Sequence, residues 1–180
     1  KITLDMSGTQ RFNVNGSERM RLTSTGLGIG TSSASCDLDV RNSSTHVIQR
    51  LVSANGSRAI IQMGDASDVA RGGIEFDSSD NSMQFNGYDN GERARIDTSG
   101  RLLVGKTSTT RTVAGVELRP DGFIRGTKDS AHSIDAVRTS DDGDVIRLYK
   151  DNTHTGSIGV AGSNPFLANP NSRGISLGSN

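Results

Sequence analysis

Apolar and polar residues alternate over short stretches along most of the chain. The first such stretches are Ile2–Met6, Phe12–Val14, Met20–Leu22 and Leu27–Ile29. An apolar residue at every second position is the pattern of a β-strand with one buried face. Between two of these stretches, Asn15-Gly16 predicts a tight hairpin, because both residue types accept a positive φ. The pattern predicts an all-β chain of short strands, with no helix of three turns or more.

One strand–turn–strand block occurs twice. Glu18–Gly26 returns as Glu92–Gly100 at a constant spacing of 74 residues. In each copy an alternating strand leads through a Ser/Thr-Gly turn into a second strand, Leu27–Ile29 or Leu102–Val104. Repetition of such a unit builds length and does not enclose a pocket.

Residues 42–90 differ from the repeated blocks and predict an inserted β-hairpin unit, a knob or small domain. Asn55-Gly56 lies between Val47–Val52 and Ala59–Met63, which favours a hairpin. The alternative for Val47–Val52 is one face of a short helix.

A second hairpin is predicted where Ile74–Phe76 and Met83–Phe85 flank a polar turn. Asn164-Pro165 and Asn169-Pro170 are expected to break any strand in their neighbourhood. Further strands are expected at Leu38–Val40, Val116–Leu118, Phe123–Ile124, Val145–Tyr149, Ile158–Val160 and Ile175–Leu177, with a turn at Pro120-Asp121-Gly122. The predicted divisions are 1–41 and 91–125 as shaft repeats, 42–90 as the inserted unit, and 126–180 as a distal β-region.

Composition argues against a compact core within one chain. Leu, Ile, Val and Phe make up 39 of 180 residues, and Gly alone contributes 22. Short strands this poor in apolar residues bury little surface by themselves, which points to burial between chains. The net charge of +0 removes the case for a nucleic-acid partner, which needs a clustered basic face. No apolar run approaches the ~20 residues of a membrane span, and the single Cys36 excludes an internal disulfide.

The strongest chemical motif is a phosphate-loop pattern at Gly100–Thr107. We do not expect Lys106 to bind phosphate, because Leu102–Val104 has the character of a strand and no helix follows it. The glycines of Gly26–Gly30 are interpreted as positions where strands of neighbouring chains approach closely. No cofactor is expected.

Three other polar groups suggest chemistry only weakly. Asp141–Asp144 lacks the spacing and terminal Glu of a calcium loop, so a solvated turn is favoured. The three histidines are too far apart in sequence for a metal set read from spacing. Ser130, His132 and Asp135 form a trio of the kind that any serine-rich chain yields by chance. We expect no enzyme.

The block Glu18–Ser33, with Leu38-Asp39-Val40 after it, resembles a block found in bacteriophage tail fibre and tailspike proteins. There it reads roughly Glu-Arg-Met-Arg-Ile, a Ser-Gly turn, Gly-Ile-Gly-Thr-Thr-Ser-Pro, then Leu-Asp-Val. This chain departs by having Ala34 in place of proline and by lacking one residue between Gly26 and Leu27. Asp144–Lys150, with Gly156–Val160 after it, is similar to fibre stretches that precede a C-terminal chaperone domain.

The resemblance implies an elongated, intertwined homotrimeric fibre, a triple β-helix or β-prism-like shaft. It implies a virion protein made in the host cytoplasm, which contacts other tail proteins and a host cell-surface glycan or protein, without membrane insertion. The alternative is a fragment of an enzymatic tailspike that depolymerises capsular polysaccharide. It also implies that the ending Leu177–Asn180 is a self-cleavage terminus.

Ligand contacts are expected in loops and not in strands, because loops on a rigid scaffold can vary without unfolding it. The longest polar stretches are 126–143 and 161–173. Tyr149 and Phe166 are the aromatic residues nearest to these stretches and are the candidates for receptor binding, since rings stack on sugars.

Overall fold

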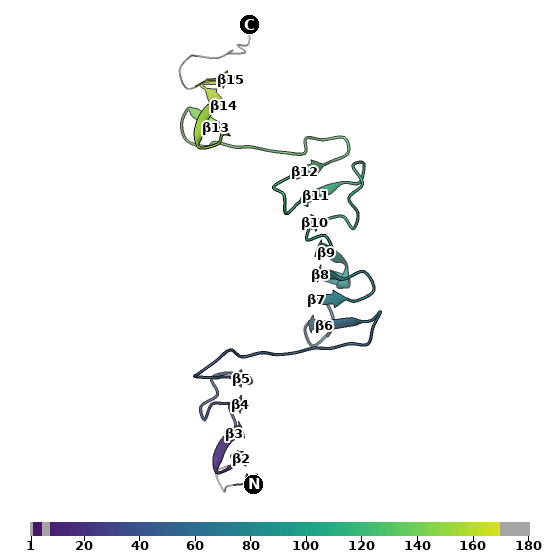
Figure 1. Ribbon diagram of the computed structural model, residues 1–180, viewed down its shortest axis with the longest axis vertical. Helices are drawn as coiled ribbons and strands as arrows, with labels where there is room; N and C mark the ends of the chain where they lie inside the picture. Colours follow the sequence, from purple (N-terminus) through teal and green to yellow (C-terminus); the bar gives the residue numbers. More distant parts are fainter. Residues whose placement is uncertain (1, 5–7, 170–180) are drawn as a thin grey trace. The chain divides into compact units, whose positions relative to one another are not determined.

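The computed structural model describes residues 2–4 and 8–169 (Figure 1). Regular structure in these residues is β, apart from one short 3-10 turn at Tyr88–Asn90 (η1). The prediction of an all-β chain of short strands is confirmed. The chain forms two compact units, Lys1–Val52 and Ser53–Asn180, which are described separately.

The first unit contains a five-stranded sheet in which each strand pairs with its neighbours in sequence. The predicted hairpin at Asn15-Gly16 is confirmed: φ is 51° at Asn15 and 82° at Gly16, as a tight hairpin turn requires. The last pair differs from the others, because β4 and β5 run parallel. The strands are β1 (Ile2–Leu4), β2 (Gln10–Val14), β3 (Ser17–Leu22), β4 (Leu27–Ile29) and β5 (Leu38–Val40).

The glycines around β4 are required by close backbone contacts within the same chain. A β-carbon on Gly26 would collide with the carbonyl oxygen of Cys36, and one on Gly30 with the carbonyl oxygen of Arg41. Both glycines also have positive φ. The close approach predicted from the sequence is therefore made by the segment that contains β5 of the same chain.

The second unit contains a seven-stranded antiparallel sheet, again with every strand next to its sequence neighbour (Figure 1). The predicted hairpin around residues 77–81 is confirmed as β7–β8. The strands of the expected inserted unit continue by hydrogen bonds from β8 into β9, so the sheet runs without a break past residue 90. The strands are β6 (Arg58–Met63), β7 (Gly72–Asp77), β8 (Ser82–Asn86), β9 (Glu92–Ile96), β10 (Leu102–Val104), β11 (Gly115–Leu118) and β12 (Ile124–Thr127).

The hairpin predicted at Asn55-Gly56 is wrong. Asn55-Gly56 does turn the chain into β6, but Val47–Val52 forms neither a strand nor a helix. Ile48 and Val52 are 78% and 80% exposed, so the segment has no apolar surface in its own unit to pack against. Without such packing a short apolar run does not settle into a regular element.

A three-stranded antiparallel sheet follows, made of β13 (Gly143–Lys150), β14 (Thr153–Ala161) and β15 (Asn164–Ala168). The expectation that Asn164-Pro165 breaks the strand is wrong, because Pro165 lies within β15 opposite Val160. β15 is an edge strand, where a residue without an N–H is tolerated. The strand predicted at Ile175–Leu177 lies outside the described residues.

Register places two continuous rows of apolar residues on one face of the seven-stranded sheet, which we call the apolar face. Residues paired across strands share a face, and so do residues two apart within a strand. The first row is Ala59, Phe76, Met83, Ile96, Leu102, Leu118 and Ile124. The second row is Ile61, Ile74, Phe85, Ala94, Val104, Val116 and Gly126.

The opposite face carries one mostly polar row between these two, which we call the polar row. Its members are Ile60, Glu75, Gln84, Arg95, Leu103, Glu117 and Arg125. Leu103 is 1% exposed and is the only buried large apolar side chain in the described part of the chain. The core of a soluble domain is thus missing from the single chain, as the composition predicted.

Candidate functional site

The apolar face remains open to solvent in the single chain. Phe76, Met83 and Leu118 are 40%, 37% and 37% exposed. On the other face, Glu75 and Glu117 are 2% and 0% exposed. This arrangement inverts the usual preference for buried apolar and exposed charged side chains. A contiguous apolar surface of this kind marks an interaction site.

The other two sheets repeat the arrangement. In the first unit, Met20 pairs with Ile29, which pairs with Val40, and Ile29 and Val40 are 39% and 42% exposed. In the three-stranded sheet, Ile158 pairs with Ile146 and Leu167, and these three side chains are 39%, 39% and 47% exposed.

Glu117 is the centre of the electrostatic network in the polar row. Its carboxylate accepts a hydrogen bond from Nε of Arg119 at 2.6 Å and one from Nη1 of Arg125 at 2.9 Å. The hydrogen bond from Arg119 is the main cause that holds the pKa of Glu117 below its usual value, and the charges of Arg125 and Lys106 add to it. The carboxylate is therefore ionised although its side chain is shielded from water.

The two copies of the repeated block also contain the same Glu–Arg ion pair. Arg21 donates to Glu18 through Nε and Nη2, at 2.8 and 2.7 Å, within β3. Arg95 donates to Glu92 through the same two atoms, at 2.7 and 2.6 Å, within β9. Two-pronged contacts of this kind fix the geometry of both partners. In both copies the strand that carries the pair is itself bulged, because Arg19 in β3 and Arg93 in β9 have no residue opposite them in the neighbouring strand.

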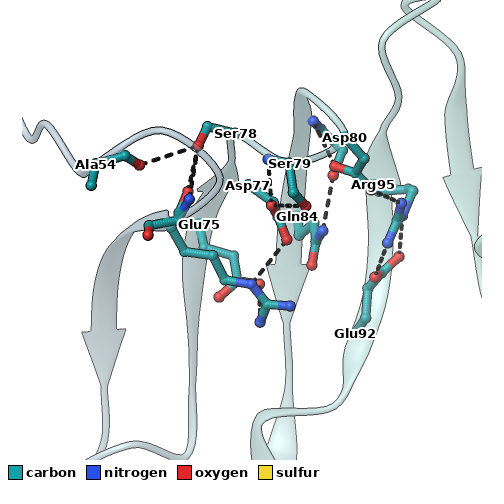
Figure 2. Close-up of polar contacts among 12 residues, drawn as sticks. Ala54, Glu75, Asp77, Ser78, Ser79, Asp80, Gln84, Glu92 and Arg95 are labelled. Atoms are coloured by element: carbon teal, nitrogen blue, oxygen red, sulfur yellow. Dashed lines mark hydrogen bonds and ion pairs between the residues drawn. The ribbon is translucent and has the colours of Figure 1, made fainter.

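Figure 2 shows how the turn between β7 and β8 is tied to the polar row. Asp77 accepts from the backbone N–H and the hydroxyl of Ser79, at 2.9 and 2.6 Å, and from Nε of Arg58 at 2.9 Å. Arg95 reaches from β9 to Asp80 of the same turn at 2.8 Å. These bonds fix the turn against the sheet.

These contacts predict a loss of stability in acid. The pKa values of several carboxyl groups lie below their usual values, because arginine, serine or backbone N–H groups donate to them: Glu18, Asp39, Asp77, Asp80, Glu117 and Asp144. A lowered pKa contributes stability that is complete above the unfolded-state value and is lost as the pH falls through the folded-state value. We expect the melting temperature, followed by circular dichroism, to be constant from pH 7 to about 5 and to fall below about pH 4.5. An unchanged melting temperature at roughly pH 3 would contradict this prediction.

Lys106 has a structural role. Leu102–Val104 is the strand β10, as predicted, and Lys106 follows it at 5% exposure. Its Nζ donates to the carbonyl oxygens of Thr110 and Val113, at 3.0 and 3.2 Å. The buried ammonium thus ties the start of the loop between β10 and β11 to two later backbone carbonyl groups of the same loop.

A basic pocket lies where this loop meets the edge strand β12. It has a volume of about 530 Å³ and is lined by Arg111, Phe123, Arg125, Gly126, Thr127, Lys128, Ala131 and Ser133. Sequence reasoning missed Arg111, Phe123 and Arg125, although 126–133 falls within one of the polar stretches expected to bind ligands. An available signal was the local charge, since residues 101–128 contain six Lys or Arg and two Asp or Glu in a neutral chain.

The two aromatic candidates from the sequence lie apart on the three-stranded sheet. Tyr149 is 57% exposed and pairs with His154, with the two ring centroids 5.3 Å apart. Phe166 pairs with Gly159, five residues further along β14, and so lies roughly 15 Å from that site. The structure does not bring the two rings together, and their role in receptor binding stays a prediction.

The other sequence motifs have local partners. His132 contacts Asp135 at 3.2 Å, while Ser130 donates to Asp129, so the described trio does not align as a relay. Asp142 accepts from the backbone N–H of Gly162 at 2.8 Å. Among residues 2–4 and 8–169, no three His, Cys, Asp or Glu side chains gather as metal ligands would.

No helix within the described residues has the length and apolar character needed to cross a membrane. Comparison with protein-family models, with curated proteins and with solved structures finds no match to this chain.

Proposed function

We propose that this chain is a segment of a homotrimeric fibre of the bacteriophage tail fibre or tailspike type. In this fibre the apolar faces of the three chains pack against one another. The observation that supports this most directly is the inverted burial in the seven-stranded sheet, where Glu117 is shielded and Phe76 and Met83 are exposed. The resemblance of Glu18–Ser33 to fibre proteins supplies the trimer and the biological setting.

Burial of the apolar faces provides the driving force for assembly. Complete burial of a Leu, Ile, Phe or Met side chain is worth about 1.5–3 kcal/mol. Most of the large apolar side chains in the two apolar rows keep about two fifths to one half of their surface exposed, so each of these gains about 1 kcal/mol on assembly. Summed over the three sheets of each chain, this gain exceeds the cost of association, which is about 4–15 kcal/mol.

The role of such a fibre is adhesion. A shaft stabilised through its apolar faces leaves its loops and its polar faces accessible to a host cell-surface glycan or protein. On this proposal the protein belongs to the virion, is made in the host cytoplasm and contacts other tail proteins.

The mass in solution tests this proposal. One chain has a mass of 19.0 kDa, so we expect light scattering after size-exclusion chromatography to give about 57 kDa, three times that value. The mass should not change on dilution through the micromolar range, because the assembly is obligate. A folded species of 19.0 kDa, or a dimer of about 38 kDa, would contradict the trimer.

A further inference from the structure

The basic pocket beside β12 is built by tethers between a loop and an edge strand. Nη1 of Arg125 donates to the carbonyl oxygen of Thr109 at 3.0 Å, and the hydroxyl of Thr127 donates to the carbonyl oxygen of Arg111 at 3.2 Å. These bonds hold the 109–111 segment against β12 and keep the pocket open.

Positive charge in and beside the pocket exceeds what the nearby acid can neutralise. Glu117 is the carboxylate that pairs with both Arg119 and Arg125. Arg111 and Lys128 also line the pocket, and neither side chain makes a hydrogen bond or ion pair to any described residue. The pocket lining thus contains three cations and no carboxylate, and the two unpaired cations are available to a ligand.

The ring of Phe123 packs against Arg119 and Arg125, the two cations that pair with Glu117. The guanidinium carbon of Arg119 lies 4.6 Å from the ring centroid and that of Arg125 lies 5.0 Å from it. Cation–π contacts at these distances are favourable, and together with Glu117 they limit the motion of both guanidinium groups. Phe123 and Arg125 therefore form a fixed part of the pocket wall, beside the two unpaired cations.

We propose that this pocket binds the anionic group of an acidic saccharide. The unpaired cations Arg111 and Lys128 pair with its carboxylate or phosphate. The hydroxyl of Ser133 and the outward backbone groups of the edge strand β12 supply donors and acceptors for sugar hydroxyls. A nucleic acid would need an extended basic stripe, whereas these cations gather around one pocket.

The size and position of the site fit a short oligosaccharide. A second pocket of about 340 Å³ adjoins the first and shares Gly126, Thr127, Lys128 and Ser133 with it, but it also includes Val116 of the second apolar row, which packing of the apolar faces would cover. Both volumes lie in the range of about 300–1,000 Å³ typical of small-ligand sites. Arg125 lies on the face opposite the apolar face, so packing of the apolar faces leaves this side of the sheet accessible.

Binding to three defined saccharides tests the proposal by calorimetry. The probes are a galacturonic acid tetramer, which carries carboxylates, mannose 6-phosphate, and a neutral galactose tetramer. We expect at least one acidic probe to bind and the neutral probe not to bind. The double variant Arg111→Ala/Lys128→Ala should weaken acidic binding at least about tenfold, and added salt should weaken binding to the unmodified protein.

Lys150→Ala is the matched control, because this exposed cation lies on β13, away from the pocket lining. It should bind as the unmodified protein does. Failure of both acidic probes to bind, equal binding of the neutral probe, or unchanged binding by the double variant would each overturn the proposal. The biological source of the saccharide rests on the adhesion proposed above. Light scattering of the same samples distinguishes failure of the fibre proposal from failure of the pocket proposal. Absence of a trimer contradicts the proposed fibre, whereas an intact trimer that does not bind the acidic probes contradicts the proposed saccharide site.

Discussion

Replacing Met83 by aspartate is expected to abolish assembly. Met83 lies in the middle of the first apolar row, paired with Phe76 on one side and Ile96 on the other. Packing of three apolar faces would desolvate three unpaired carboxylates, and the effective penalty is several kcal/mol per ion. We expect Met83→Asp to reduce the mass from about 57 kDa to 19.0 kDa at micromolar concentration.

Val69→Asp is the control for this variant. Val69 is 77% exposed in the connection between β6 and β7 and belongs to neither apolar row. The control adds the same charge and should keep the mass of the assembly. A Met83→Asp protein that still assembles would show that another surface holds the copies together, and loss of assembly in both variants would point to a general charge effect.

Replacing Glu117 by glutamine is expected to lower the thermal stability of the protein strongly. The substitution preserves shape but removes the one charge that pairs with Arg119 and Arg125. Removal of one partner from a shielded ion pair is strongly destabilising, because the remaining charges lose their compensation. We expect the melting temperature at neutral pH to fall by roughly 10 °C.

Asp37→Asn provides the comparison for the charge change. Asp37 is exposed, and its carboxylate makes no hydrogen bond or ion pair to the described residues. Its replacement by asparagine should change the melting temperature by less than roughly 2 °C. An equally small change for Glu117→Gln would mean that the arginines find water or other acceptors, and that the polar row does not depend on this carboxylate.

Most strands could be predicted because turn residues and alternation agree. Asn15-Gly16 and the turn ending at Gly122 both have the expected positive φ at glycine, and the strands flank them as predicted. The predictions were wrong where the structure of a segment depends on which other strands lie beside it. Val47–Val52 has the composition of a strand without a surface to pack on, and Pro165 is tolerated because β15 lies at a sheet edge.

The functional surfaces were predictable to different degrees. Alternation together with a low apolar content predicted burial between chains, and the open apolar face is where that burial can occur. The basic pocket was not predicted, because Arg111 and Arg125 are separated by 14 residues and meet only through the fold of the β10–β12 region. The parallel pairing of β4 with β5 was also not evident, since alternation gives no strand direction.

Pairing between sequence neighbours in all three sheets has a consequence for biosynthesis. Each described strand hydrogen-bonds to the strand before or after it in the same chain, so contacts are local and contact order is low. The sheets can therefore form one after another while the ribosome is still extending the chain. In the proposed trimer, only the packing of complete sheets from different chains is intermolecular, and its rate would depend on how many nascent copies lie close together, as they do on a polysome.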